Sequence, residues 1–149
     1  MNKNGLTLVE VLVSIAILVF LTTITLGALR LMSGNERVSV EAKKVVNAVE
    51  EARSKTLSSE GGQRFGVYIK AREVTLYEDP YVENNVNNKN FYIEGGVTVS
   101  SYTLAGGGDK ILFKKVSGET DNDGVVVLTS SSGNTKQIII QKTGNAYIE

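Results

Sequence analysis

The sequence predicts an α+β fold in which one long N-terminal helix packs on a C-terminal antiparallel β-sheet domain. Three observations lead to this prediction. An apolar run near the start is followed by an amphipathic segment of helical period. After Gly62 the period of the apolar residues changes to two, which is typical of β-strands. Turns rich in glycine and asparagine separate these later segments.

The composition fits one folded domain with one appended element, and it excludes several classes of function. The 149 residues are 42% hydrophobic and 21% charged, and 16 basic residues balance 16 acidic ones. This balance argues against nucleic-acid binding, which normally requires a basic excess. The chain has no Cys and no His, so disulfides, imidazole catalysis and the usual zinc sites are excluded. We therefore expect neither an enzyme nor a cofactor.

The first element, residues 6–30, is expected to be a transmembrane and assembly helix. From Leu6 to Leu29 the chain is apolar or small and neutral, except for the carboxylate of Glu10. As a helix this segment spans about 36 Å, which is enough to cross a bilayer once. An acid deep in a bilayer costs roughly 2.5–3.5 kcal/mol, so Glu10 needs a partner. A cleaved signal peptide with a cut near Gly27 and a plain membrane anchor are alternatives, but neither accounts for Glu10.

The stretch NGLTLVEVLVSIAILVFL resembles the class III signal of type IV pilins and type II secretion pseudopilins. In that signal a short basic leader ends in Gly and is followed by an apolar residue, Thr, two apolar residues, Glu and a long apolar helix. The resemblance implies that residues 1–5 are a leader peptide and that a prepilin peptidase cuts between Gly5 and Leu6. The same enzyme would N-methylate Leu6, where the family usually has Phe.

The resemblance also implies a partner for Glu10. Cleavage frees an amine at Leu6, and Glu10 of a neighbouring subunit can lie against that amine when the apolar helices pack together. Opposite charges about 4 Å apart attract by about 4 kcal/mol at an effective dielectric near 20. This attraction offsets much of the desolvation cost and favours one stagger between helices, so Glu10 is a candidate residue for subunit assembly. An acid tolerated near the membrane interface is the alternative.

Residues 31–60 are expected to continue the helix as an amphipathic segment that packs on the sheet. Small apolar residues recur at spacings of three and four and form one stripe: Val38, Ala42, Val45, Val46, Val49 and Ala52. Charged residues are expected at the positions between them: Glu36, Glu41, Lys43, Lys44, Glu50, Glu51, Arg53 and Lys55. Gly61 and Gly62 are expected to end the helix.

Residues 61–149 are expected to form a β-rich globular head. The segments RFGVYIKA and REVTLYE predict a hairpin that turns at Ala71 and Arg72. Six further segments have the composition of strands: NFYIE, GVTVSSYTL, KILFKKV, GVVVLTS, KQIIIQK and NAYIE. The stretch from Asp79 to Asn90 contains the only proline and is interpreted as a long surface loop.

A narrower resemblance follows from VEEARSKTLSSEGGQRFGVYI, which is similar to the GspH/FimT-type minor pseudopilin pattern. In that pattern an Ala-Arg-Ser helix end, here Ala52, Arg53 and Ser54, leads through a short loop with glycine into a strand. The closing IIIQKTGNAYI resembles the final hairpin of the same group.

Two other clusters of the sequence are candidate binding sites. Glu119, Asp121 and Asp123 could offer oxygen ligands to calcium, although the bidentate acid that ends a calcium loop is missing and a solvated turn is favoured. The basic residues of the later strands could form a DNA-contacting patch, but acids are interspersed among them and an ordinary solvated face is favoured. These basic residues are Lys114, Lys115, Lys136 and Lys142.

Taken with the resemblance, these features predict a structural subunit, minor rather than major, of a type IV pilus-like fibre, a competence fibre or a type II secretion pseudopilus. The partners implied are a prepilin peptidase, other pilin or pseudopilin subunits and the inner-membrane assembly platform. The implied location is the inner membrane, crossed once with the head outside the cytoplasm, and afterwards the fibre. The alternative is a membrane-anchored or secreted β-rich binding domain that is not part of a fibre.

Overall fold

The computed structural model describes residues 7–58 and 62–149, but not the side chains of residues 24–33. The chain divides between Ser33 and Gly34 into two compact units, and each unit is considered by itself. Helix α1 (Leu8–Leu57) is the only helix of the described residues, and it contributes to both units.

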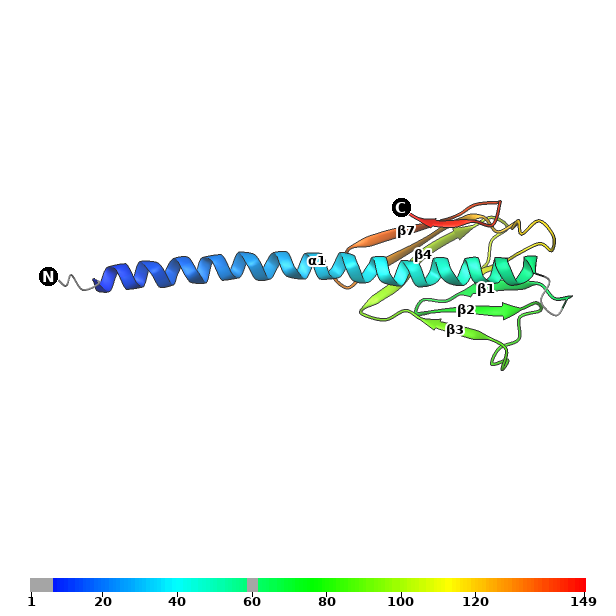
Figure 1. Cartoon of the computed structure of the whole chain (residues 1–149), viewed down its shortest axis with the longest axis horizontal. Helices are drawn as coiled ribbons and strands as arrows, with labels where there is room; N and C mark the ends of the chain where they lie inside the picture. Colours follow the sequence, from blue (N-terminus) through cyan, green and yellow to red (C-terminus); the bar gives the residue numbers. More distant parts are fainter. Residues whose placement is uncertain (1–6, 59–61) are drawn as a thin grey trace. The chain divides into compact units, whose positions relative to one another are not determined.

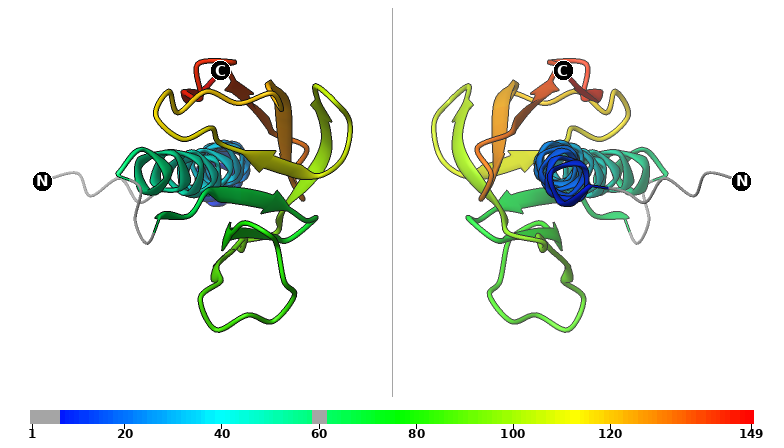
Figure 2. Two further views of the ribbon diagram at one scale, coloured as in Figure 1. Left: turned by 90° about the vertical axis from the view of Figure 1, so that its right-hand side faces the viewer. Right: turned by 90° about the vertical axis from the view of Figure 1, so that its left-hand side faces the viewer.

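In the second unit, residues 34–57 of α1 lie between two antiparallel sheets, one on each side of the helix (Figures 1 and 2). Sheet 1 has the order β3-β2-β1-β5 and is formed by β1 (Phe65–Ile69), β2 (Glu73–Glu78), β3 (Lys89–Tyr92) and β5 (Lys110–Leu112). Sheet 2 has the order β4-β6-β7-β8 and is formed by β4 (Val97–Leu104), β6 (Gly124–Ser130), β7 (Thr135–Ile140) and β8 (Ala146–Ile148).

The predicted fold class is confirmed, because the helix carries an apolar stripe that faces antiparallel strands. Val38, Ala42, Val45, Val49 and Ala52 are each 1% exposed or less, and Val46 is half-buried against them. Their small side chains let the helix approach the strands of both sheets closely. Alternate residues of the strands complete this core: Val67, Ile69, Val74, Leu76, Ile111, Val126, Leu128, Ile138 and Ile140.

Each predicted strand segment contains a strand, but the strands form two sheets where the sequence predicted one. The predicted hairpin is present, since β1 and β2 pair with Ile69 opposite Val74. The chain changes sheet between β3 and β4, returns to sheet 1 between β4 and β5, and changes again between β5 and β6. Strand β5 pairs with β1, and Ile111 lies opposite Val67 in this pairing.

The connection between β3 and β4 is held on the helix by Glu41, one of the charged residues that lie between the apolar positions in the sequence. Glu41 is buried, with only 6% of its surface exposed. Its carboxylate lies 2.9 Å from the Lys44 ammonium and accepts a hydrogen bond of 3.3 Å from the Glu94 N–H. The Lys44 ammonium in turn donates to the Tyr92 carbonyl. A charge is stable at this buried position because both of its oxygens have partners.

We expect Glu41→Ala to lower the free energy of unfolding by about 2 kcal/mol, since it leaves a backbone N–H and an ammonium without their acceptor. Glu41→Gln should cost less, because an amide oxygen still accepts from the Glu94 N–H. The matched control is Glu51→Ala, which removes an exposed pair with Lys89 and should cost less than about 1 kcal/mol. Thermal unfolding of the full chain in detergent micelles measures the three changes. Equal losses for Glu41→Ala and Glu51→Ala would contradict this role for Glu41.

Three tyrosines form a cluster on the face of sheet 1 that points away from α1. The Tyr81 ring lies edge-on to the Tyr68 and Tyr77 rings, with centroids 4.9 and 5.2 Å apart. Tyr77 is 2% exposed, and it covers Gly66, where an added Cβ would lie 2.7 Å from the Tyr77 ring. Burial, reinforced by the nearby Asp79 carboxylate, raises the pKa of Tyr77 to about 12.

This shift predicts a loss of stability at alkaline pH. The Tyr77 pKa is higher in the folded chain than the ordinary value near 10, so the unfolded chain loses its proton first as the pH rises. The stabilisation is therefore complete below pH 10 and is lost progressively between about pH 10 and 12. Tyr77→Phe should flatten this part of the curve of melting temperature against pH, whereas Tyr147→Phe, at an exposed position, should not. Identical curves for wild type and Tyr77→Phe would refute the assignment.

Candidate functional site

The N-terminal segment of α1 begins with a capping arrangement around Thr7. The Thr7 hydroxyl oxygen accepts a hydrogen bond of 3.3 Å from the Glu10 N–H, and the Thr7 carbonyl accepts from the Val11 N–H. Thr7-Leu8-Val9-Glu10 has the spacing of a capping box, with Glu10 at the third helical position. A carboxylate is favoured there by the positive end of the helix dipole. The sequence-based reading missed this role of Thr7, although the T-x-x-E spacing signals it.

Glu10 differs from the other polar residues of the described part of this segment, residues 8–23. Ser14, Thr22 and Thr23 each donate a hydrogen bond of 2.7 or 2.8 Å to a backbone carbonyl three or four residues earlier. Their hydroxyl groups are thereby satisfied without water or a partner chain. The Glu10 carboxylate has no hydrogen bond or ion pair with any described residue. It is the one polar side-chain group of residues 8–23 that still requires a partner.

The rest of this segment has an exposed apolar surface. Its large hydrophobic side chains are 44–79% exposed: Leu8, Val9, Val11, Leu12, Val13, Ile15, Ile17, Leu18, Val19, Phe20 and Leu21. They lie on all sides of the helix rather than on one stripe, and a helix that is apolar all round is normally buried in protein or lipid. These exposed apolar side chains therefore favour burial of the segment in lipid or against other helices.

Several predictions for this region fall outside the described residues. Gly5 and Leu6, which form the predicted cleavage and methylation site, are among residues 1–6, and the side chains of residues 24–33 are likewise not described. In the part of the chain that the structure describes, no helix meets the length and hydropathy needed to cross a membrane.

The Ala-Arg-Ser end of the helix has a structural explanation. Arg53 Nε donates a hydrogen bond of 3.2 Å to the Gly118 carbonyl. The backbone also approaches Arg53 at Gly144, where an added Cβ would lie 2.9 Å from Arg53 Nε and 2.0 Å from the Gly118 carbonyl oxygen. Gly144 has φ +83°, which adds a second reason for glycine. Arg53 thus fastens the helix to two turns of the head.

Thr56, three residues further on, connects the same helix end to sheet 1. Its side chain is fully buried. The hydroxyl donates to the Ala52 carbonyl and accepts from the Phe65 N–H, both at 2.9 Å. These two bonds fix the start of β1 against the helix. Arg53 and Thr56 therefore position the head on α1, and we assign them no chemistry.

The structure does not support the candidate calcium site formed by Glu119, Asp121 and Asp123. The described residues contain no group of three carboxylates able to hold a metal ion. Asp121 is instead paired with the Lys114 ammonium at 2.6 Å, and this hydrogen bond raises the pKa of Lys114. Asn122, which the sequence did not single out, organises the turn by accepting from the Leu112 N–H and donating to the Ala105 carbonyl.

The four lysines of the candidate DNA-contacting patch have different surroundings in the structure. Lys114 is taken up by Asp121, and the Lys115 ammonium donates to the Gly62 carbonyl. Lys136 lies near the start of β7, whereas Lys142 follows the end of the same strand. One of the four lysines is therefore paired with an acid, another binds a backbone carbonyl, and the remaining two lie near opposite ends of β7.

Comparison with known proteins found one match to the N-terminal segment and one to the fold. Residues 1–26 match the prokaryotic N-terminal methylation motif, and no curated protein sequence is significantly similar to the chain. The chain is similar to the crystal structure of the minor pseudopilin EpsH from the type II secretion system of Vibrio cholerae, with 15% sequence identity and a TM-score of 0.57. The similarity covers 76% of this chain and 94% of the EpsH chain.

The two matches support the sequence-based recognition from different parts of the molecule. The motif covers the segment with Gly5, Leu6 and Glu10, and at this low identity the structural similarity shows the shared fold. This chain thus carries the prokaryotic N-terminal methylation motif and has the pilin-like α+β fold, a long N-terminal helix packed on antiparallel β-sheets.

Proposed function

We propose that the chain is a structural subunit of a pilus-like or pseudopilus fibre, assembled through the N-terminal part of α1. The observation that carries the proposal is the contrast within residues 8–23: every hydroxyl group is satisfied by its own helix, the apolar side chains are exposed, and the Glu10 carboxylate has no described partner. The apolar side chains require an apolar environment, and the Glu10 carboxylate requires a positively charged partner within it.

The proposed source of the charge is the amine of Leu6 on a neighbouring copy, exposed when prepilin peptidase cuts after Gly5. The Glu10 position in the first helical turn supports this pairing, because it lies only four residues from the new N-terminus. Methylation of the Leu6 amine leaves it basic and does not remove the positive charge. Neighbouring helices then fit together at the stagger that places each carboxylate on an amine.

The proposed course begins with a precursor in the inner membrane, with residues 6–30 spanning it once and the head outside the cytoplasm. The assembly platform then moves processed subunits into the fibre, where the apolar helices form the centre. The fold shared with EpsH supports a minor subunit of the pseudopilus type, and the GspH/FimT-like helix end at Arg53 supports the same group. The role is structural, without a reaction catalysed by this chain.

Mass spectrometry of the protein extracted from membranes of cells that contain a prepilin peptidase tests the processing step. We expect loss of residues 1–5 and a mass increase of one methyl group on the peptide that begins with Leu6. The same cells without the peptidase should yield the unprocessed chain, and Gly5→Leu should do so in cells that have it. An intact N-terminus in the presence of the peptidase, or a cut near Gly27, would instead favour an anchored or secreted binding domain.

A further inference from the structure

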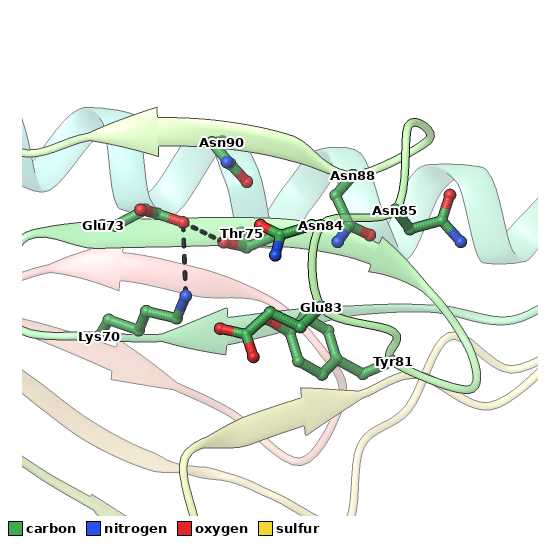
Figure 3. Close-up of a pocket in the computed structure, with 9 residues that line it drawn as sticks. All are labelled: Lys70, Glu73, Thr75, Tyr81, Glu83, Asn84, Asn85, Asn88 and Asn90. Carbon is green, nitrogen blue, oxygen red and sulfur yellow. Dashed lines mark hydrogen bonds and ion pairs between the residues drawn. The ribbon is translucent and has the colours of Figure 1, made fainter.

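A polar pocket lies on the outer face of sheet 1, the face that points away from residues 34–57 of α1. Thr75 of β2 is paired in register with Tyr68 of β1 and Asn90 of β3, so these three side chains are neighbours on one face. The opposite face carries Val74 and Leu76, which belong to the core. The loop that follows β2 folds back over the outer face and closes the pocket on one side (Figure 3).

The loop is fixed in place by its own side chains. Tyr81 packs edge-on against Tyr68, and the Lys110 ammonium lies over the Tyr81 ring, 4.8 Å from its centroid. Asn88 donates a hydrogen bond of 2.8 Å to the Val82 carbonyl. The wall of the pocket is therefore held against the strands by aromatic contacts and hydrogen bonds, as a preformed binding site requires.

The groups that face the pocket divide into two sets. Glu73 is occupied, because it accepts a hydrogen bond of 2.8 Å from Thr75 and lies 3.7 Å from the Lys70 ammonium. The carboxamides of Asn84 and Asn90 make no side-chain hydrogen bond to any described residue. Figure 3 shows both of them beside the cluster of Glu73 and Thr75. Two groups that can each donate and accept are thus available to a ligand.

The charges and the size of the pocket limit the class of ligand. Two carboxylates, of Glu73 and Glu83, face one ammonium, of Lys70, which disfavours an anion. The ammonium beside Glu73 disfavours a metal ion, and the described residues contain no three carboxylates grouped to hold one. The lining is polar apart from the Tyr81 ring, so an apolar ligand would leave polar groups unpaired. The pocket has a volume of about 40 Å³, which is room for only a few water molecules, so a ligand can insert small polar groups such as hydroxyls while the rest of it stays outside.

We propose that this pocket binds one edge of a neutral sugar ring, with the carboxamides of Asn84 and Asn90 hydrogen-bonding the hydroxyl groups of that edge. Adjacent sugar hydroxyls each donate and accept, and a carboxamide offers both functions at once. The Tyr81 side chain also lines the pocket. All residues of the site belong to sheet 1, the turn between β1 and β2 and the loop after β2, so none of them is among residues 8–23, which carry the proposed assembly role.

The test is a titration of the full chain, isotopically labelled and embedded in lipid nanodiscs, with the side-chain amide signals observed by NMR. Nanodiscs are needed because alkyl glycoside detergents carry sugar headgroups that would compete. The probes are the methyl glycosides of glucose, galactose, mannose and N-acetylglucosamine, with N-acetylneuraminic acid and Ca²⁺ as charged comparisons. We expect at least one neutral glycoside to shift the Asn84 and Asn90 amide signals in a saturable way. An oligosaccharide of the same sugar that binds more tightly than the glycoside would identify a polysaccharide as the source.

Three variants and one control make the result specific. Asn90→Ala and Asn84→Gly each remove a carboxamide and should weaken binding by up to about tenfold; glycine is chosen because Asn84 has φ +59°. Glu83→Gln keeps a hydrogen-bonding side chain and should change the affinity for a neutral sugar less than about twofold. Asn47→Ala, at an exposed site on α1, should leave binding unchanged.

The proposal is overturned if no neutral glycoside shifts these signals, or if only the acidic sugar or Ca²⁺ does. Unchanged affinity in the Asn84→Gly, Asn90→Ala double variant would overturn it equally. The chemical shifts of core amides show whether each variant remains folded, so a loss of binding through unfolding is recognised. The proposed role in fibre assembly does not depend on any of these results, because the pocket and residues 8–23 share no residue.

Discussion

Glu10→Gln is expected to be processed and methylated normally but to enter fibres about tenfold less well than the wild type. The substitution preserves the size of the side chain, and glutamine fits the third helical position of a capping box as glutamate does. It removes only the charge, and with it an attraction of about 4 kcal/mol at an effective dielectric near 20. Part of this attraction is offset by the smaller desolvation cost of glutamine. Quantitative blotting of the sheared fibre fraction against the membrane fraction measures the effect.

The matched control is Ser14→Ala, one helical turn further along the same segment. The Ser14 hydroxyl donates to the Glu10 carbonyl within the helix, so its removal leaves no group without a partner and incorporation should stay near that of the wild type. Wild-type incorporation of Glu10→Gln would show that the carboxylate has no pairing role. A defect of equal size in both variants would point to disturbed helix packing rather than to a lost charge.

Phe113→Ala is expected to lower the free energy of unfolding of the head by about 3–5 kcal/mol. Phe113 is fully buried, immediately follows β5 and forms an isolated bridge with Thr120. Truncation leaves a cavity in the core. Because domains of this size are stable by roughly 5–15 kcal/mol, the variant should melt far below the wild type. Thermal unfolding of the full chain in detergent micelles, followed by near-ultraviolet circular dichroism of the tyrosines, measures the shift.

Val86→Ala is the control for this substitution, because Val86 is 96% exposed and its truncation should change stability by less than about 0.5 kcal/mol. A shift of comparable size in both variants would mean that Phe113 is not part of a close-packed core. Retention of most of the stability in Phe113→Ala would mean that the surrounding side chains collapse into the cavity, contrary to the rigid packing between α1 and the two sheets.

Much of the fold follows from local patterns that the sequence displays. The small apolar residues from Val38 to Ala52 recur with the period of a helix, and the strands alternate with a period of two. The hairpin between β1 and β2 also follows from local turn chemistry. The division into two sheets does not, because the return of β5 to β1 depends on contacts between segments distant in the sequence. Loop closure of this kind has no local signal.

The residues of the candidate assembly site were predictable only in part. Gly5, Leu6 and Glu10 were recognised from an ordered motif, and the same stretch held a capping signal at Thr7 that was missed. The burial of Glu41 was not predicted, because a buried charge on an amphipathic helix is recognisable only once its partners are known, and the Glu94 N–H lies 53 positions away. The polar pocket escaped detection for the same reason, since it requires the fold of the loop after β2.

The central claim is that Glu10 of one copy meets the N-terminal amine of another, and zero-length cross-linking tests it most directly. Fibres assembled from a mixture of ¹⁴N- and ¹⁵N-labelled subunits would be treated with a carbodiimide, which joins a carboxylate to an adjacent amine, and digested for mass spectrometry. We predict an amide between Glu10 and Leu6 in peptides that combine both isotopes, absent when Glu10→Gln replaces the wild type. Intact fibres in which this bond joins only peptides of the same label, or does not form, would contradict the account.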